Sequence, residues 1–218
     1  MKENLTEIIF ILDRSGSMAG LESDTIGGYN SFLEEQKKVE GEAHVTTVLF
    51  DNNYEVLHDG VDIKSVNPIT RKEYFARGTT ALLDAVGLTI NRVVERIKKT
   101  DESQRPSKVI FIITTDGLEN SSVEFTYTQV KQMVSYQQSK YNWEFLFLGA
   151  NIDAAKEADS LGIKANRASN YVADSQGSNL IYGTLASSIA SFRCDGVIDD
   201  NWNEEIETDI KSRRSRRS

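Results

Sequence analysis

The chain has very few residues that could cross-link or rigidify it. Its 218 residues include one cysteine, Cys194, and two prolines, Pro68 and Pro106. A single cysteine excludes an internal disulfide and is compatible with a reducing compartment. The first apolar run, Ile8 to Leu12, ends at Asp13, which makes it too short for a signal-peptide core or a membrane span. We therefore expect a cytoplasmic protein without a membrane span.

Basic residues are scarce except at the C-terminus. The net charge is −8, yet the last eight residues, KSRRSRRS, carry five positive charges and no negative ones, which leaves −13 on the preceding 210 residues. An acidic body argues against a nucleic-acid-binding surface on the fold itself. Nucleic acid would therefore be bound, if at all, through the basic tail at 211–218.

Short apolar runs predict the sheet. Residues 6–12, 107–114 and 143–149 are apolar and rich in β-branched side chains, as is typical of strands covered on both faces of a parallel sheet. Residues 43–50 and 53–58 are separated by only two residues, so they must form an antiparallel hairpin. The sequence therefore predicts an α/β sheet, mostly parallel, with one reversed edge strand.

Apolar side chains at helical spacing predict the helices that cover this sheet. We expect helices over 21–39, 80–98, 126–140, 151–161 and 177–192, with a last strand near 170–173. Gly27 and Gly28 lie inside the first helix, where each glycine costs roughly 1 kcal/mol, so they indicate a kink or a close packing contact. No internal repeat or linker divides residues 1–194, which we interpret as one domain.

The remaining residues, 195–218, form a tail of two parts. The first part, 195–210, has seven acidic and no basic residues, and its apolar side chains at every fourth position predict a short amphipathic helix: Ile198, Trp202, Ile206 and Ile210. The basic octet follows. One interpretation is a disordered end folded against the acidic body. The other is an electrostatic handle for nucleic acid, an anionic membrane surface or an acidic partner.

Polar side chains follow two of the predicted parallel strands. Asp13 and the two serines, Ser15 and Ser17, come after the first strand. Asp116 lies in the segment TTDG, 114–117, which follows the strand predicted at 107–114. Thr79 and Thr80 open the helix at 80–98. In open α/β sheets, ligands bind at the carboxyl ends of the strands where the strand order reverses. We therefore expect these three loops to converge there.

The converging groups would form a site made of oxygen ligands only. Such a set suits a hard divalent cation, Mg²⁺, Mn²⁺ or Ca²⁺. Two carboxylates balance the ion's charge, and the hydroxyls leave it electrophilic, so it would accept one further anionic oxygen from a partner's Glu or Asp. The alternative is a helix N-cap cluster at Asp13, Ser15 and Ser17.

Three motifs together, D-x-S-x-S after the first strand, G-T-T-A-L and T-D-G, resemble the metal-ion-dependent adhesion site (MIDAS) of the von Willebrand factor A (vWA) domain family. The resemblance covers about residues 6–193, and the flanking sequence is similar to intracellular bacterial or phage members, including tellurium-resistance-type proteins. It implies a Rossmann-like doubly wound sheet of six strands, in the order 3-2-1-4-5-6, with strand 3 antiparallel. It also implies metal ligands on these three motifs: Asp13, Ser15, Ser17, Thr80 and Asp116, with Thr79 as the competing threonine.

The implied function is a protein-binding module, not an enzyme. The competing hypotheses are a Mg²⁺-dependent phosphohydrolase or phosphotransferase with Asp13 as nucleophile, and nucleic-acid binding through the tail. Phosphatases of that type usually carry a second acid two residues after the nucleophile, where this chain has Ser15. The chain also lacks a G-x-x-x-x-G-K-[ST] phosphate loop and a G-x-G-x-x-G fingerprint.

Overall fold

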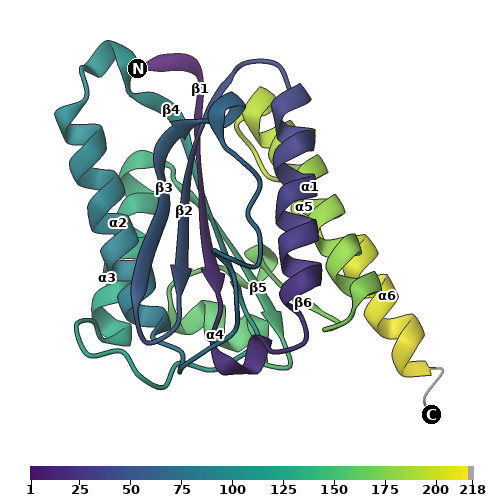
Figure 1. The fold of residues 1–218 in the computed structure, drawn as a ribbon. Coiled ribbons are helices and arrows are strands. Elements are labelled where there is room, and N and C mark those ends of the chain that lie inside the picture. Colours follow the sequence, from purple (N-terminus) through teal and green to yellow (C-terminus); the bar gives the residue numbers. More distant parts are fainter. Residues whose placement is uncertain (216–218) are drawn as a thin grey trace.

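The chain folds around a six-stranded sheet (Figure 1). The computed structural model describes residues 1–215. The strands are β1 (Lys2–Asp13), β2 (Glu42–Phe50), β3 (Tyr54–Asp62), β4 (Pro106–Thr115), β5 (Glu144–Ala150) and β6 (Ala168–Tyr171). Their order is β3-β2-β1-β4-β5-β6, and every neighbouring pair is parallel except β2 with β3. The predicted fold class, strand order and reversed third strand are therefore confirmed.

Helices cover both faces of the sheet. One face carries α1 (Glu22–Lys38), α5 (Ser175–Asp195) and α6 (Glu204–Ser215), and the other carries α2 (Leu82–Lys99), α3 (Tyr127–Tyr141) and α4 (Ala154–Ser160) (Figure 1). Side chains of a strand alternate between the two faces. Ile8 and Phe10 of β1 therefore pack into one core cluster, and Ile9 and Ile11 into the other. A buried strand of this kind reads as a continuous apolar run, as the sequence showed.

The paired glycines of α1 have different roles. A Cβ atom on Gly28 would lie 2.0 Å from the ring of Tyr182, so α1 and α5 approach each other there as only glycine permits. A Cβ on Gly27 would meet no atom within 4 Å. The helix runs unbroken from Glu22 to Lys38. The predicted close contact is therefore confirmed at Gly28, and no break interrupts the helix.

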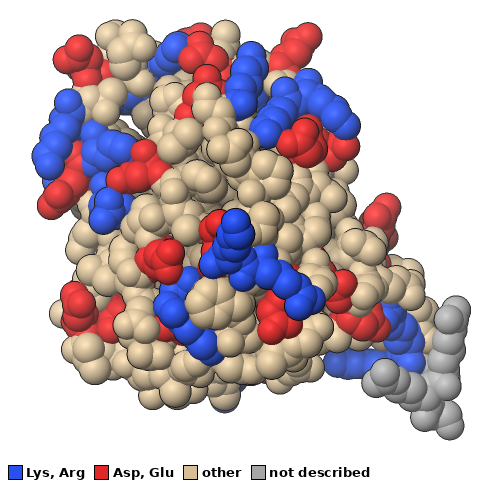
Figure 2. All heavy atoms as spheres, in the orientation of Figure 1, with Lys and Arg blue, Asp and Glu red and all other residues tan. Residues whose placement is uncertain are grey.

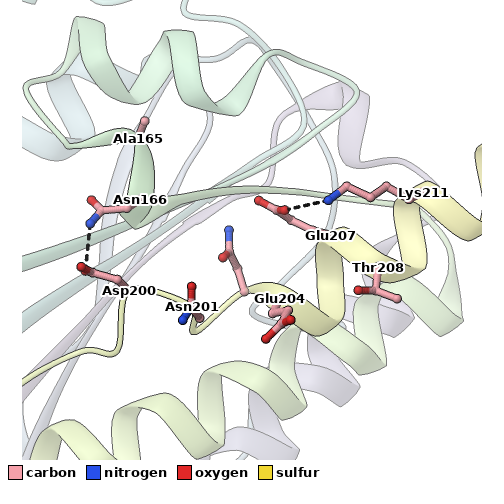
Figure 3. A pocket seen from close by; sticks show the side chains of 9 residues that line it. Ala165, Asn166, Asp200, Asn201, Glu204, Glu207, Thr208 and Lys211 are labelled. Carbon is pink, nitrogen blue, oxygen red and sulfur yellow. Dashed lines mark hydrogen bonds and ion pairs between the residues drawn. The ribbon is translucent and has the colours of Figure 1, made fainter.

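The C-terminal segment packs on the α1–α5 face. Ile198, Trp202 and Ile206 are buried in the same core cluster as β1, and the indole Nε1 of Trp202 donates to the carbonyl of Asn166 at 2.9 Å. The predicted amphipathic helix is right only for its second half, because α6 begins at Glu204. Figure 3 shows the polar hollow between α6 and the segment at 165–167, where Asn166 donates to Asp200 at 2.9 Å.

The first part of the basic tail continues α6. Arg213 pairs with Asp174 at 2.6 Å and with Asp209 at 2.7 Å, and Lys211 pairs with Glu207 at 3.2 Å. Helical structure therefore replaces the disorder considered for residues 204–215. The rest of the predicted basic tail, 216–218, lies outside the described residues.

Charged side chains of both signs are interspersed over the face shown in Figure 2. The negative net charge therefore does not gather into one patch on this face. Within residues 1–215, no helix combines the length and the apolar character that a bilayer crossing requires.

Candidate metal centre

The three predicted loops meet at one edge of the sheet. β1 and β4 are adjacent and parallel, so Asp13 at the end of β1 and Asp116 just after β4 emerge side by side. The loop before α2 is tied to the loop after β1, because Gly16 N–H donates to the carbonyl of Gly78 at 3.1 Å. The structure thus brings together residues from all three motifs: Asp13, Ser15, Ser17, Thr80 and Asp116.

The hydroxyl groups of this cluster lie close to one another. Ser15 Oγ and Ser17 Oγ are 3.0 Å apart, and the Ser17 hydroxyl donates to Asp116 Oδ1. A Cβ atom on Gly117 would lie 3.2 Å from Thr80 Oγ1 and 3.3 Å from Ser17 Oγ, so both hydroxyls border the same small space. Only glycine leaves that space free.

The two neighbouring threonines differ in burial. Thr80 is buried, whereas Thr79 is exposed. The backbone of Thr80 is held on both sides by Asn120, whose Oδ1 accepts from Thr80 N–H at 2.9 Å and whose N–H donates to the Thr80 carbonyl at 3.0 Å. The geometry therefore favours Thr80 as the hydroxyl that faces the cluster.

Asp13 is fully buried without a cationic partner. Its Oδ1 accepts from Ser15 N–H and its Oδ2 from the Thr115 hydroxyl, both at 2.6 Å. Burial raises the pKa of Asp13 to about 6, although these hydrogen bonds oppose the shift. Burial also raises the pKa of Asp116, against the hydrogen bond from Ser17. Within residues 1–215, no Lys or Arg forms an ion pair with either carboxylate.

The N-cap interpretation applies at most to Asp13, which accepts the Ser15 N–H, and not to the two serine side chains. Ser15 does occupy the position before a short 3-10 helix, Gly16–Met18, but its side chain accepts no capping hydrogen bond. The two serine hydroxyls contact each other and Asp116 instead. They are therefore free to act as ligands.

The donor set fits a hard divalent ion. In an octahedron with Mg–O distances of about 2.1 Å, adjacent ligand oxygens are about 3.0 Å apart, which matches the separation of Ser15 Oγ and Ser17 Oγ. Nowhere in the described part of the chain do three or more His, Cys, Asp or Glu side chains form a group able to hold a metal. A site at this edge would therefore depend on hydroxyl ligands as much as on carboxylates.

Asp51, in the β2–β3 turn, holds the threonine loop in place. Its buried carboxylate accepts from Arg14 Nε and Arg77 Nε, each at 2.8 Å, and from Asn53 N–H at 2.8 Å. Burial raises its pKa, but the hydrogen bonds from Arg77, Asn53 and Arg14 outweigh burial and the net shift is downward. The Asp51 carbonyl also accepts from Ala81 N–H at 3.0 Å.

Sequence reasoning missed Asp51, because Asp51 and Asn52 were interpreted only as a tight connection between strands. Thr115 was missed too, although it directly follows Thr114 on the strand that leads to Asp116. Gly78, which precedes the two threonines, has a φ of +66°, a conformation that favours glycine.

Asp84 anchors the loop after β4. Its carboxylate accepts from the N–H groups of Val123, Glu124 and Phe125 at 2.8, 2.9 and 2.8 Å. Asp84 is itself buried. Glu119 secures the same loop to the start of α2, where its Oε2 accepts from Leu83 N–H at 2.9 Å.

The sheet order, the reversed third strand and the helices on both faces define a von Willebrand factor A fold. No protein-family model matches the chain. No curated protein matches it by sequence.

Three solved structures illustrate the likeness. The vWF domain of the type V pili tip protein Mfa5 from Porphyromonas gingivalis is 10% identical, with a TM-score of 0.62 over 89% of this chain and 98% of that one. The pilus adhesin SpaC from Lactobacillus rhamnosus GG is 11% identical, with a TM-score of 0.64 over 87% of this chain and 31% of that one.

The third is proximal thread matrix protein 1 from the mussel byssus, in a structure with a zinc-occupied MIDAS motif. It is 13% identical, with a TM-score of 0.60 over 85% of this chain. This chain spans 46% of the length of the mussel protein. At such identities the likeness shows the fold, and the function must be argued from the residues of this chain.

Proposed function

We propose that the chain is a metal-dependent protein-binding module. A divalent cation held by the cluster at the edge of β1 and β4 would dock an acidic side chain of a partner protein; the ligands are Asp13, Ser15, Ser17, Thr80 and Asp116. The observation that carries this proposal is the pair of buried carboxylates, Asp13 and Asp116. They lie beside three hydroxyl groups and form no ion pair with a Lys or Arg of residues 1–215.

The bound ion would supply a positive centre with one coordination position open to a carboxylate. Mg²⁺ suits this set of oxygen ligands, and the 3.0 Å separation of Ser15 Oγ and Ser17 Oγ is compatible with its coordination shell. Mn²⁺ or Ca²⁺ would suit the same oxygen ligands. The zinc in the mussel protein's MIDAS motif supports divalent binding by this type of fold. In this chain, Asp13 and Asp116 would balance the charge, while the neutral hydroxyls keep the ion electrophilic.

A binding role agrees better with the surroundings of Asp13 than phosphohydrolysis does. A nucleophilic carboxylate needs a free oxygen that reaches the substrate. Both oxygens of Asp13 accept hydrogen bonds, from Ser15 N–H and the Thr115 hydroxyl, and the residue is fully buried. In this position it can serve a metal ion directly or through water, but it has no free oxygen directed at a substrate. Nucleic-acid binding through the tail is also less favoured, because Lys211 and Arg213 already pair with carboxylates. Cytoplasmic location and a bacterial or phage source stay predictions.

Capture of a partner by the immobilised chain tests the proposal. We expect capture from a cell extract in Mg²⁺, loss of capture in EDTA, and loss by Asp13→Asn in Mg²⁺. Glu124→Gln is the matched control, because it removes an exposed negative charge from the loop after β4 without touching the cluster. It should capture as the wild type does.

A purified partner then allows the carboxylate to be identified. Its acidic surface residues are replaced by the corresponding amides, one at a time. We expect one replacement to reduce capture as much as EDTA does. Equal capture in Mg²⁺ and EDTA, or full capture by Asp13→Asn, contradicts the proposal. Metal-dependent phosphate release that disappears in Asp13→Asn would instead favour the phosphohydrolase.

A further inference from the structure

A second candidate site lies at the opposite edge of the sheet. The C-terminal ends of α2 and α3 and the start of β4 enclose a groove of about 460 Å³, within the range typical of small-molecule sites. It is formed at the end of the sheet where the N-terminus lies, away from the metal cluster (Figure 1). Its main lining residues are Val94, Ile97, Lys98, Tyr136, Gln137 and Trp143.

The walls of the groove are aromatic. Trp143 stacks on Phe111 inside the core, with ring centroids 5.5 Å apart and an interplanar angle of 21°, so its ring is held rigidly. Tyr136 and Tyr141 lie edge to face at 5.9 Å and are about half exposed, at 53% and 52%. Rigid aromatic walls favour a flat, aromatic occupant, because rings gain from stacked or edge-to-face contact.

The rim of the groove is positively charged within an otherwise acidic chain. Lys98, Lys140 and Arg105 line it, and Glu102 is the one carboxylate among its lining residues. In the described part of the chain, none of the three cations forms an ion pair. Arg105 is held in place by its hydrogen bonds to the carbonyls of Thr100, at 2.8 Å, and Lys98, at 3.2 Å. The rim therefore favours an anion.

One polar group of the groove is without a partner. No hydrogen bond within residues 1–215 involves the indole N–H of Trp143, whereas that of Trp202 is bonded to Asn166. The indole of Trp143 can therefore donate to an acceptor on an occupant. The side-chain oxygen of Gln137 also accepts no hydrogen bond from these residues, but it is closed to solvent, so an occupant of the groove does not reach it.

We propose that this groove binds a small planar aromatic carboxylate. The ring lies between Trp143 and the two tyrosines, and the carboxylate faces Lys98 and Lys140. The lysines also complement the negative C-terminal ends of α2 and α3. Because the lysines have this second role, the experiment must distinguish a loss of anion binding from a loss of helix stability.

The two tryptophans make the test specific, since the chain has only Trp143 and Trp202. The ¹⁵N-labelled full chain should show two indole N–H resonances, and Trp143→Phe assigns them. Titration with indole-3-acetate should shift the resonance of Trp143 and leave that of Trp202 unchanged. Indole-3-acetamide, which has the same ring and no charge, should bind roughly fivefold more weakly at low salt, as expected for two exposed charge contacts.

Variants assign the contacts. Lys98→Gln with Lys140→Gln should remove the preference for the acetate over the acetamide. Lys99→Gln is the matched control, since Lys99 follows Lys98 on α2 but does not line the groove. The remaining resonances of each spectrum report whether the variant is folded.

Three results would overturn the proposal. One is an unshifted Trp143 resonance at millimolar indole-3-acetate. Another is equal affinity for the acetate and the acetamide in the wild type. The third is a Trp143 resonance that shifts with protein concentration alone, which would assign the groove to a second copy of the chain.

Discussion

Strand β1 carries two buried carboxylates, Glu7 and Asp13, whose surroundings differ. Glu7 lies toward the N-terminal end of the sheet and is 2% exposed, while Asp13 ends the strand and is fully buried. Burial raises the pKa of both residues. What differs is the group that compensates the charge.

Glu7 is compensated within the chain. Arg96 Nη2 lies 2.7 Å from its Oε1, and the Thr46 hydroxyl donates to the same oxygen at 3.0 Å. Arg96 is itself fixed by Asp59 at 2.8 Å. The charge of Arg96 opposes the effect of burial on the pKa of Glu7. This is a complete structural ion pair.

Asp13 has only neutral donors. A backbone N–H and a hydroxyl satisfy its oxygens, and its neighbour Asp116 is a second acid. A buried charge without a counter-charge is costly. The comparison teaches that two adjacent buried acids without a cation, beside several hydroxyl groups, indicate a metal site better than acidic residues alone do.

Loss of the cation beside Glu7 should have the largest effect. Arg96→Met leaves a buried carboxylate unpaired and should lower the free energy of unfolding by about 3 kcal/mol, equally in Mg²⁺ and in EDTA. Arg92→Gln is the control: Arg92 also pairs with Asp59, but its side chain is 43% exposed, so the loss should stay below about 1 kcal/mol. Urea unfolding measures the free energy of unfolding of both variants. Equal decreases would contradict the expected difference between the buried and the exposed ion pair.

Removal of the charge of Asp13, unlike the loss of Arg96, should not destabilise the metal-free protein. Asp13→Asn retains an acceptor for Ser15 N–H and offers a donor to Thr115 Oγ1, so the metal-free protein should be as stable as the wild type or more so. Mg²⁺ at about 100 times its Kd should stabilise the wild type by about 2.7 kcal/mol and the variant not at all. Thermal unfolding in Mg²⁺ and EDTA measures this. A metal-free variant that is clearly less stable would mean that the carboxylate is compensated within the chain.

The adjacent threonines provide a smaller effect. Thr80→Val removes the hydroxyl that borders Gly117 and should weaken Mg²⁺ binding about tenfold, equivalent to roughly 1.4 kcal/mol. Thr79→Val changes an exposed neighbour in the same way and should leave affinity unchanged. Isothermal titration calorimetry distinguishes them. The reverse order would make Thr79 the ligand.

The last prediction concerns how a stability difference changes with pH at Asp51, a buried acid that resembles Glu7 in having arginine partners. Its pKa is lowered on folding, so its contribution to stability is complete above about pH 4, near its unfolded pKa, and is lost as the pH falls through the folded pKa. The stability difference between wild type and Asp51→Asn should therefore shrink below about pH 4. Denaturant unfolding from pH 7 to pH 3 measures it. A constant difference would show that Asp51 is not stabilised by Arg14 and Arg77.

Much of the fold could be predicted because its signals are local. Continuous apolar runs identified the buried strands, and the two-residue gap after Phe50 required the reversed third strand. The end of the chain was harder. Ile198 and Trp202 have helical spacing with Ile206, but they precede α6 and are buried by packing on the rest of the core. Spacing cannot tell a helix from an irregular segment whose apolar side chains dock elsewhere.

For the candidate site, too, local sequence signals predicted one part and tertiary contacts decided the rest. The sequence by itself identified the candidate ligands, since Asp13, Ser15, Ser17 and Asp116 follow strands that end at one edge of a parallel sheet. Only the tertiary structure decided which threonine faces them, that Asp84 is buried, and that Asp51 holds the loop. Those facts depend on hydrogen bonds between residues far apart in the chain, and the spacing of residues along a sequence does not specify such contacts.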